Sequence, residues 1–62
     1  MKRTDLMKQL RGIANDQGIT YAVTEGGSHT KVYLGDRFVT VPRHREINEL
    51  TARGILRDAR GD

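Results

Sequence analysis

The hydrophobic positions of the chain follow a helical period in its first eighteen residues. The apolar residues there recur at i, i+4, i+7 and i+8, on one face of a helix: Leu6, Leu10, Ile13 and Ala14. This spacing predicts an amphipathic helix that begins after Thr4 and ends at Gly18. Threonine suits a helix N-cap, and glycine suits the residue that follows a helix.

Between residues 19 and 41 the period shortens to two, which predicts three strands. Apolar and polar residues alternate over residues 19–25, 29–34 and 37–41. The strands are separated by Gly26-Gly27-Ser28 and by Gly35-Asp36, which are residue types found in tight turns. Pro42 ends the third strand, because proline has no N–H to donate to a sheet. We therefore expect an antiparallel meander.

A helical period returns after Arg43-His44-Arg45, which we interpret as a polar connection. Asn48 is a suitable N-cap for the second helix. Its apolar stripe consists of Ile47, Leu50, Ile55, Leu56 and Ala59. Gly54 interrupts this helix at a cost of roughly 1 kcal/mol relative to alanine. Close packing against the sheet would be a reason for a glycine there.

Together these elements predict one α+β domain over residues 1–62, in the order α-β-β-β-α. A three-stranded antiparallel sheet with both helices packed on one face buries every apolar stripe and leaves the other face exposed to solvent. We expect Val32 and Leu34 to point to the helices. The period of two then places His29, Lys31 and Tyr33 together on the solvent-exposed face.

The charge balance adds a preference for anionic partners. The 62 residues include 11 Lys+Arg and 8 Asp+Glu, for a formal net charge of +3. In the segment from residue 29 to residue 45, Asp36 is the only acid opposing four cations: Lys31, Arg37, Arg43 and Arg45. Such a segment favours an RNA backbone. Tyr33 and Phe38 would either stack on RNA bases or serve only in packing.

Composition also argues against several classes of protein. Cysteine is absent, so neither disulfides nor thiolate metal sites are expected, and a cytoplasmic setting fits. His29 and His44 lack the spacing of a metal-binding motif, and we expect no metal or other cofactor. The chain begins without the apolar segment of a signal peptide and has no stretch of about 20 apolar residues. We therefore expect no membrane association.

The order of four short segments resembles the HicA mRNA interferase toxins. A helix with Leu6 and Leu10 is followed by Gly27-Ser28-His29, by Val39-Thr40-Val41-Pro42, and by Thr51-Ala52-Arg53-Gly54-Ile55-Leu56. The family has a double-stranded-RNA-binding-like (dsRBD-like) fold, with the catalytic histidine in a Gly-Ser-His segment on the sheet. It often has glycine before the threonine of the last helix, where this chain has Leu50. That difference predicts a helix that begins earlier.

The resemblance implies the function of a toxin in a type II toxin–antitoxin system. Such a toxin is an endoribonuclease that cleaves mRNA independently of the ribosome. The resemblance also implies neutralisation by a HicB-like antitoxin protein. An acidic antitoxin that covers the basic face and buries His29 is the simplest form of inhibition.

His29 is accordingly the candidate catalytic residue. Metal-free RNA cleavage requires a base for the ribose 2′-hydroxyl, an acid for the leaving 5′-oxygen, and cations for the phosphate. An imidazole can make either proton transfer near neutral pH. The residues expected to bind the substrate are Gly27, Ser28, Lys31, Arg43 and Arg45.

Several alternatives stay open at this point. His29 is either the base or the acid, and His44 is either a second proton donor or a solvated residue of a basic connection. A nucleophilic Ser28 is not expected, because successive strand residues point to opposite faces. The domain could also bind structured RNA without cutting it, or serve mainly as a partner for the antitoxin.

Overall fold

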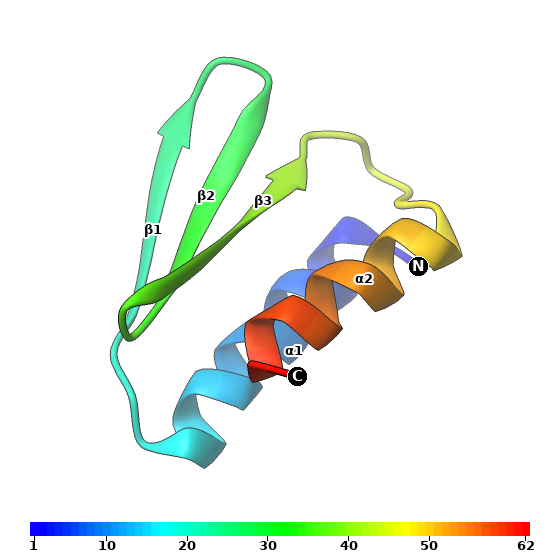
Figure 1. Ribbon diagram of the computed structural model, residues 1–62. Helices are drawn as coiled ribbons and strands as arrows, with labels where there is room; N and C mark the ends of the chain where they lie inside the picture. Colours follow the sequence, from blue (N-terminus) through cyan, green and yellow to red (C-terminus); the bar gives the residue numbers. More distant parts are fainter.

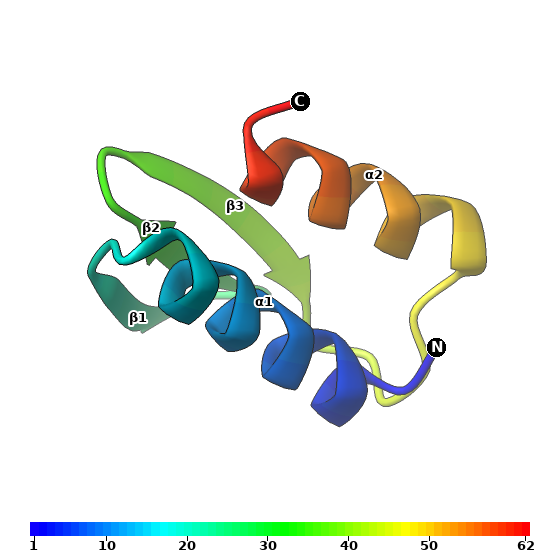
Figure 2. The same ribbon diagram turned by 90° about the horizontal axis from the view of Figure 1, so that it is seen from below.

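The computed structural model describes residues 1–62 as two helices and one three-stranded sheet. The elements are α1 (Arg3–Gln17), β1 (Tyr21–Gly26), β2 (His29–Leu34), β3 (Arg37–Pro42) and α2 (Glu49–Arg60). The strands pair antiparallel in the order β1-β2-β3. Both helices lie on the same face of this sheet (Figures 1 and 2). The predicted α+β fold is confirmed.

Two tight turns set the register of the sheet. Gly26 pairs with His29, and Leu34 pairs with Arg37, so each turn contains only two residues. Val32 then lies opposite Val39, and both are buried under the helices. His29 and Lys31 are exposed on the other face, as the alternating pattern predicts.

The core lies between the sheet and the two helices. Leu6, Leu10 and Leu34 are fully buried in it. The remaining buried apolar residues come from both helices, from β2 and β3, and from the β3–α2 connection, whereas β1 contributes none. They are Ala14, Val32, Val39, Val41, Ile47, Ala52, Leu56 and Ala59. Burying a large aliphatic side chain contributes roughly 1.5–3 kcal/mol, so this cluster supplies most of the stabilisation of a small domain. Neither helix is both long enough and apolar enough to span a membrane.

The first helix begins earlier than predicted. It starts at Arg3 rather than after Thr4, and Lys2 precedes it without capping it through its side chain. Main-chain bonds to the β3–α2 connection replace the cap. The Arg3 N–H donates to the Arg45 carbonyl at 2.8 Å, and the Ile47 N–H donates to the Met1 carbonyl at 2.7 Å. Such long-range partners cannot be read from the local sequence.

The boundaries of the strands also differ slightly from the prediction. β1 begins at Tyr21 rather than at residue 19, and it includes Gly26. The reason lies in the end of α1, where the Ile19 N–H donates to the Ala14 carbonyl at 3.0 Å and so closes the helix. β3 extends to Pro42, which pairs with His29 at the edge of the sheet.

The second helix confirms some expectations and contradicts others. Asn48 caps it, since its side-chain oxygen accepts from Leu50 N at 2.9 Å and Thr51 N at 3.4 Å. The helix begins at Glu49, before Thr51, as expected from Leu50. However, Leu50 is 76% exposed and does not belong to the buried stripe. No atom lies within 4 Å of a Cβ built on Gly54, so close packing does not explain that glycine.

Arg37 serves the fold rather than an exposed basic surface. It pairs with Leu34 and therefore projects to the helix side of the sheet. One of its guanidinium nitrogens donates to Gln17 Oε1 at 2.7 Å and to the Ala59 carbonyl at 2.8 Å. Arg37 thus joins the start of β3 to the ends of both helices.

A polar cluster joins α1 to the opposite end of the sheet. Thr30 is fully buried, and its hydroxyl accepts from Arg3 Nη2 and donates to Glu25 Oε1, the latter at 2.7 Å. Arg3 also donates from Nε to the Pro42 carbonyl at 3.0 Å. Arg43 donates to the same Glu25 oxygen at 2.9 Å. These four side chains, Arg3, Glu25, Thr30 and Arg43, are called the Thr30 cluster below.

Thr30→Val should lower the free energy of unfolding by roughly 1–3 kcal/mol, because Arg3 and Glu25 each lose a buried partner. Thr40→Val is the matched control, since Thr40 is exposed on the other face of the sheet and should change stability by about 0.5 kcal/mol or less. Urea unfolding measures both. Equal effects of the two substitutions would show that the cluster does not stabilise the fold.

Candidate functional site

The turn between β1 and β2 delivers His29 to the open face of the sheet. Gly27 is the first of its two residues and has φ of 50°, which is where type II′ hairpin turns place glycine. His29 then begins β2 and is exposed. Since φ is positive at Gly27, a residue with a side chain would strain the turn that positions the imidazole.

Ser28 contacts the imidazole directly. Its Oγ lies 3.1 Å from His29 Nδ1, a hydrogen bond that holds one side of the ring. The expectation that these side chains point to opposite faces is wrong, because Ser28 belongs to the turn and not to the strand. His29 Nε2 makes no hydrogen bond within the protein. One ring nitrogen is therefore oriented by Ser28, and the other is free for a ligand.

His29 lines a hollow of about 380 Å³ on the open face. All three strands contribute to this His29 hollow, which is formed by Thr24, Glu25, Gly26, His29, Lys31, Tyr33 and Thr40. The register places Lys31 between Thr24 and Thr40. An imidazole, an ammonium group and two threonine hydroxyls therefore meet in one depression. Such a group of donors and charges is suited to a phosphate ester and to proton transfer.

Two aromatic rings continue the open face beyond Lys31. Tyr33 and Phe38 pack with their centroids 5.7 Å apart and their planes tilted by 42°. Lys31 Nζ lies 5.2 Å from the Phe38 centroid, within cation–π distance. Phe38 remains 53% exposed despite these contacts. The rings pack on each other and still present area to solvent.

Arg43 and Arg45 lie apart from this hollow. Arg43 forms an ion pair with Glu25 and does not line the His29 hollow. Arg45 lies beside the start of α1 and lines a different hollow with Lys2 and Arg3. His44 does not line the His29 hollow, and it makes no hydrogen bond with the protein. Of the predicted residues, the structure brings together His29 and Lys31, with Gly27 and Ser28 at the adjoining turn.

Two residues that line the His29 hollow, Glu25 and Thr24, were not predicted, whereas the period of two already places Thr40 on the open face. Glu25 is the only acidic residue of the lining, and Thr24 lies opposite Lys31. A signal for both was present, since a two-residue turn at residues 27 and 28 pairs 25 with 30 and 24 with 31. The choice of turn length decides this register, and the three small residues 26–28 left it open.

No group of three or more histidine, aspartate or glutamate side chains is arranged to hold a metal ion. The chain matches no family model, no curated protein and no solved structure.

Two glycine substitutions should change stability in opposite directions. Gly27→Ala should lower the free energy of unfolding by about 1–2 kcal/mol, because a side chain is disfavoured at positive φ.

Gly54→Ala should raise the free energy of unfolding by up to about 1 kcal/mol, because the helix has room for a methyl group and alanine favours helix. Urea unfolding measures both changes. A destabilised Gly54→Ala protein would mean that this position contacts more than the structure shows.

Proposed function

We propose that this protein is a metal-independent endoribonuclease that cleaves mRNA, with His29 in proton transfer. The observation that carries the proposal is the His29 hollow, where an imidazole with a free Nε2 shares a depression with Lys31 on an exposed face. The resemblance of the Gly27-Ser28-His29 segment and its neighbours to HicA toxins supports the same activity.

The proposed reaction is a transesterification within the RNA. The ribose 2′-oxygen attacks the adjacent phosphorus while the bond from phosphorus to the 5′-oxygen breaks. One proton leaves the 2′-hydroxyl and one proton reaches the 5′-oxygen, so the products are a 2′,3′-cyclic phosphate and a 5′-hydroxyl. His29 makes one of these two proton transfers. DNA is not a substrate, because it lacks the 2′-hydroxyl.

The other side chains of the face have supporting roles in this proposal. Lys31 places a positive charge beside the phosphate that gains charge in the transition state. Ser28 holds the imidazole through Nδ1, and the Gly27 main chain keeps the turn in place. Tyr33 and Phe38 offer ring faces to unpaired bases, which favours single-stranded segments of mRNA. Arg43 and Arg45 contact phosphates at a greater distance from the reacting bond.

The same proposal assigns a cellular role and a partner. The chain acts in the cytoplasm as the toxin of a type II toxin–antitoxin pair, and a HicB-like antitoxin neutralises it. Because the hollow is open and carries a cation, an acidic protein surface laid over β2 and β3 would block the substrate.

A second candidate function is RNA binding without cleavage. The aromatic pair and Lys31 favour it, because stacking and phosphate contacts bind a single strand whether or not a proton is transferred. His29 would then be an exposed residue with no role in chemistry.

His29→Ala should reduce cleavage of a mixed-sequence RNA by roughly 10²- to 10⁴-fold, which is the usual contribution of general acid–base catalysis. The assay contains a chelator and identifies the end groups of the fragments. His44→Ala is the matched control, as a second exposed histidine outside the hollow, and should cut at the wild-type rate. Wild-type cleavage by His29→Ala would remove His29 from the mechanism. Binding without fragments from any of the three proteins would favour the RNA-binding module.

A further inference from the structure

A second polar hollow lies at the junction of α1 and the β3–α2 connection. Its volume is about 410 Å³, and no hydrophobic side chain lines it. The lining residues are Lys2, Arg3, Thr4, Arg43, Arg45 and Glu46. Four of these six are cations, and none of the other larger hollows is lined by more than three. The cations Lys2, Arg3, Arg43 and Arg45 define the basic hollow.

The single carboxylate of this hollow is already engaged. Glu46 Oε2 lies 3.0 Å from the Met1 amine, and Glu49 lies 3.2 Å from the same amine. Hydrogen bonds to Glu46 and then to Glu49 raise the pKa of that amine above its usual value, because both carboxylates favour its charged form. Glu46 is therefore held by the Met1 amine, and the four cations of the hollow outnumber its one carboxylate.

Two of the cations are fixed in place, and two are free. Arg3 is held by Thr30 and by the Pro42 carbonyl, and Arg43 is held by Glu25. Lys2 and Arg45 make no side-chain hydrogen bond or ion pair within the protein. Rigid cations lower the entropy cost of binding an anion, and unpaired cations lose no internal partner when they bind one.

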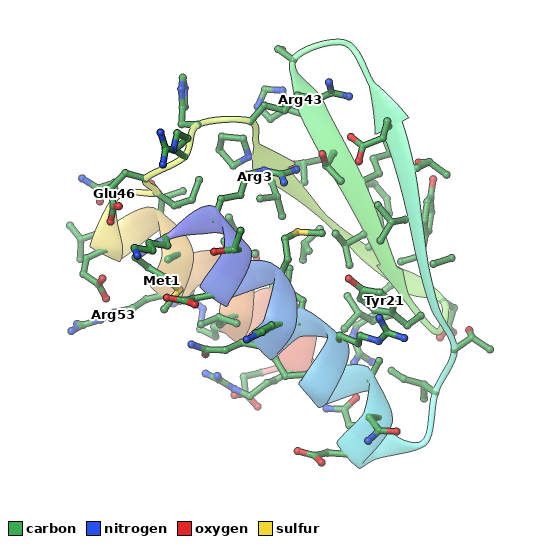
Figure 3. The ribbon with its side chains drawn as sticks, turned by 180° about the vertical axis from the view of Figure 1, so that it is seen from behind. Met1, Arg3, Tyr21, Arg43, Glu46 and Arg53 are labelled. Carbon is green, nitrogen blue, oxygen red and sulfur yellow. The ribbon has the colours of Figure 1, made fainter.

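The basic hollow adjoins the His29 hollow through the Thr30 cluster. Arg3 and Arg43 also line a smaller depression with Glu25, and Glu25 lines the His29 hollow as well. Figure 3 shows Arg3 and Arg43 converging at the end of the sheet, with Glu46 beside Met1 and away from them. Pro42, which pairs with His29, immediately precedes Arg43. The surface is thus continuous around the end of the sheet, from the open face to the start of α1.

We infer that the basic hollow binds phosphodiester groups of an RNA strand whose reacting nucleotide lies at His29. This inference rests on the proposed function, and it adds Lys2 and Arg3 to the residues that hold the substrate. The phosphates in the basic hollow lie several nucleotides away from the reacting bond, so they contribute affinity and direction of the strand rather than chemistry. The contact is to phosphate, and it is the same for every base sequence.

The test removes the two free cations and leaves the Thr30 cluster intact. The variant is Lys2→Gln with Arg45→Gln, and the probe is a single-stranded RNA of mixed sequence that is 2′-O-methylated throughout and cannot be cleaved. Its binding constant is measured against salt concentration. The slope of log K against log salt should decrease in magnitude by about 1.4, which is 0.7 for each lost phosphate contact on a single strand. Affinity at low salt should fall by roughly tenfold.

The matched control is Arg53→Gln with Arg57→Gln, which removes the same charge from the exposed face of α2. This control should change the slope much less than the test variant does. Equal slopes for the two variants would overturn the inference, because only net charge would then matter. DNA of the same sequence should show the same loss of slope, and a loss confined to RNA would overturn the assignment to phosphate.

Failure of the inference and failure of the proposed function give different results. If His29-dependent cleavage occurs and the Lys2 and Arg45 variant binds like the control, the basic hollow is not a binding site. The proposed endoribonuclease activity is then still supported. If the slope of log K against log salt decreases by the predicted amount in that variant but no RNA is cut, the basic hollow is a phosphate site of a binding module. If the wild-type protein does not bind the methylated RNA at low salt, the inference is wrong.

Discussion

The pairing of Gly26 with His29 is the constraint on which the rest of the structure depends. It follows from a turn of only two residues, in which Gly27 takes a positive φ that other residues avoid. A register shifted by one residue would move every side chain of β1 to the other face. In the observed register Tyr21 packs against the core opposite Leu34, and Thr24 lies beside Lys31 on the open face. Core and candidate site are thus two results of one hairpin.

The Thr30 cluster links stability to the candidate site. Thr30 is a polar residue at a fully buried position, and it is tolerated there because Arg3 and Glu25 satisfy its hydroxyl. The same contacts fix the positions of Arg3, Arg43 and the Glu25 carboxylate at the end of the sheet where His29 begins β2. Charged groups that hold α1 to the sheet therefore also shape the electrostatic surface that an anionic ligand would meet.

In the proposed function the two hollows have different roles in RNA recognition. In that proposal the His29 hollow holds the group that transfers protons, whereas the basic hollow supplies an excess of positive charge. A single imidazole on an open sheet binds substrate weakly by itself, because solvent screens its neighbours. Phosphate contacts around the end of the sheet would raise the local concentration of RNA at His29. Seven kilodaltons of protein would then combine chemistry and affinity without an enclosed pocket.

The sequence by itself determined the element order, the faces of the residues of β2 and the exposure of His29. These properties depend on local periods and turn residues, which can be recognised from nearby positions such as the alternating Thr30, Val32 and Leu34. It did not determine the start of α1, the exposure of Leu50 or the structural use of Arg37. The start of α1 and the use of Arg37 depend on partners more than twenty residues away, which are Arg45 for Arg3 and Ala59 for Arg37. Only the tertiary structure brings Lys2 and Arg3 beside Arg43 and Arg45, because the main-chain bond between Arg3 and Arg45 joins distant segments, and such a contact leaves no period in the chain.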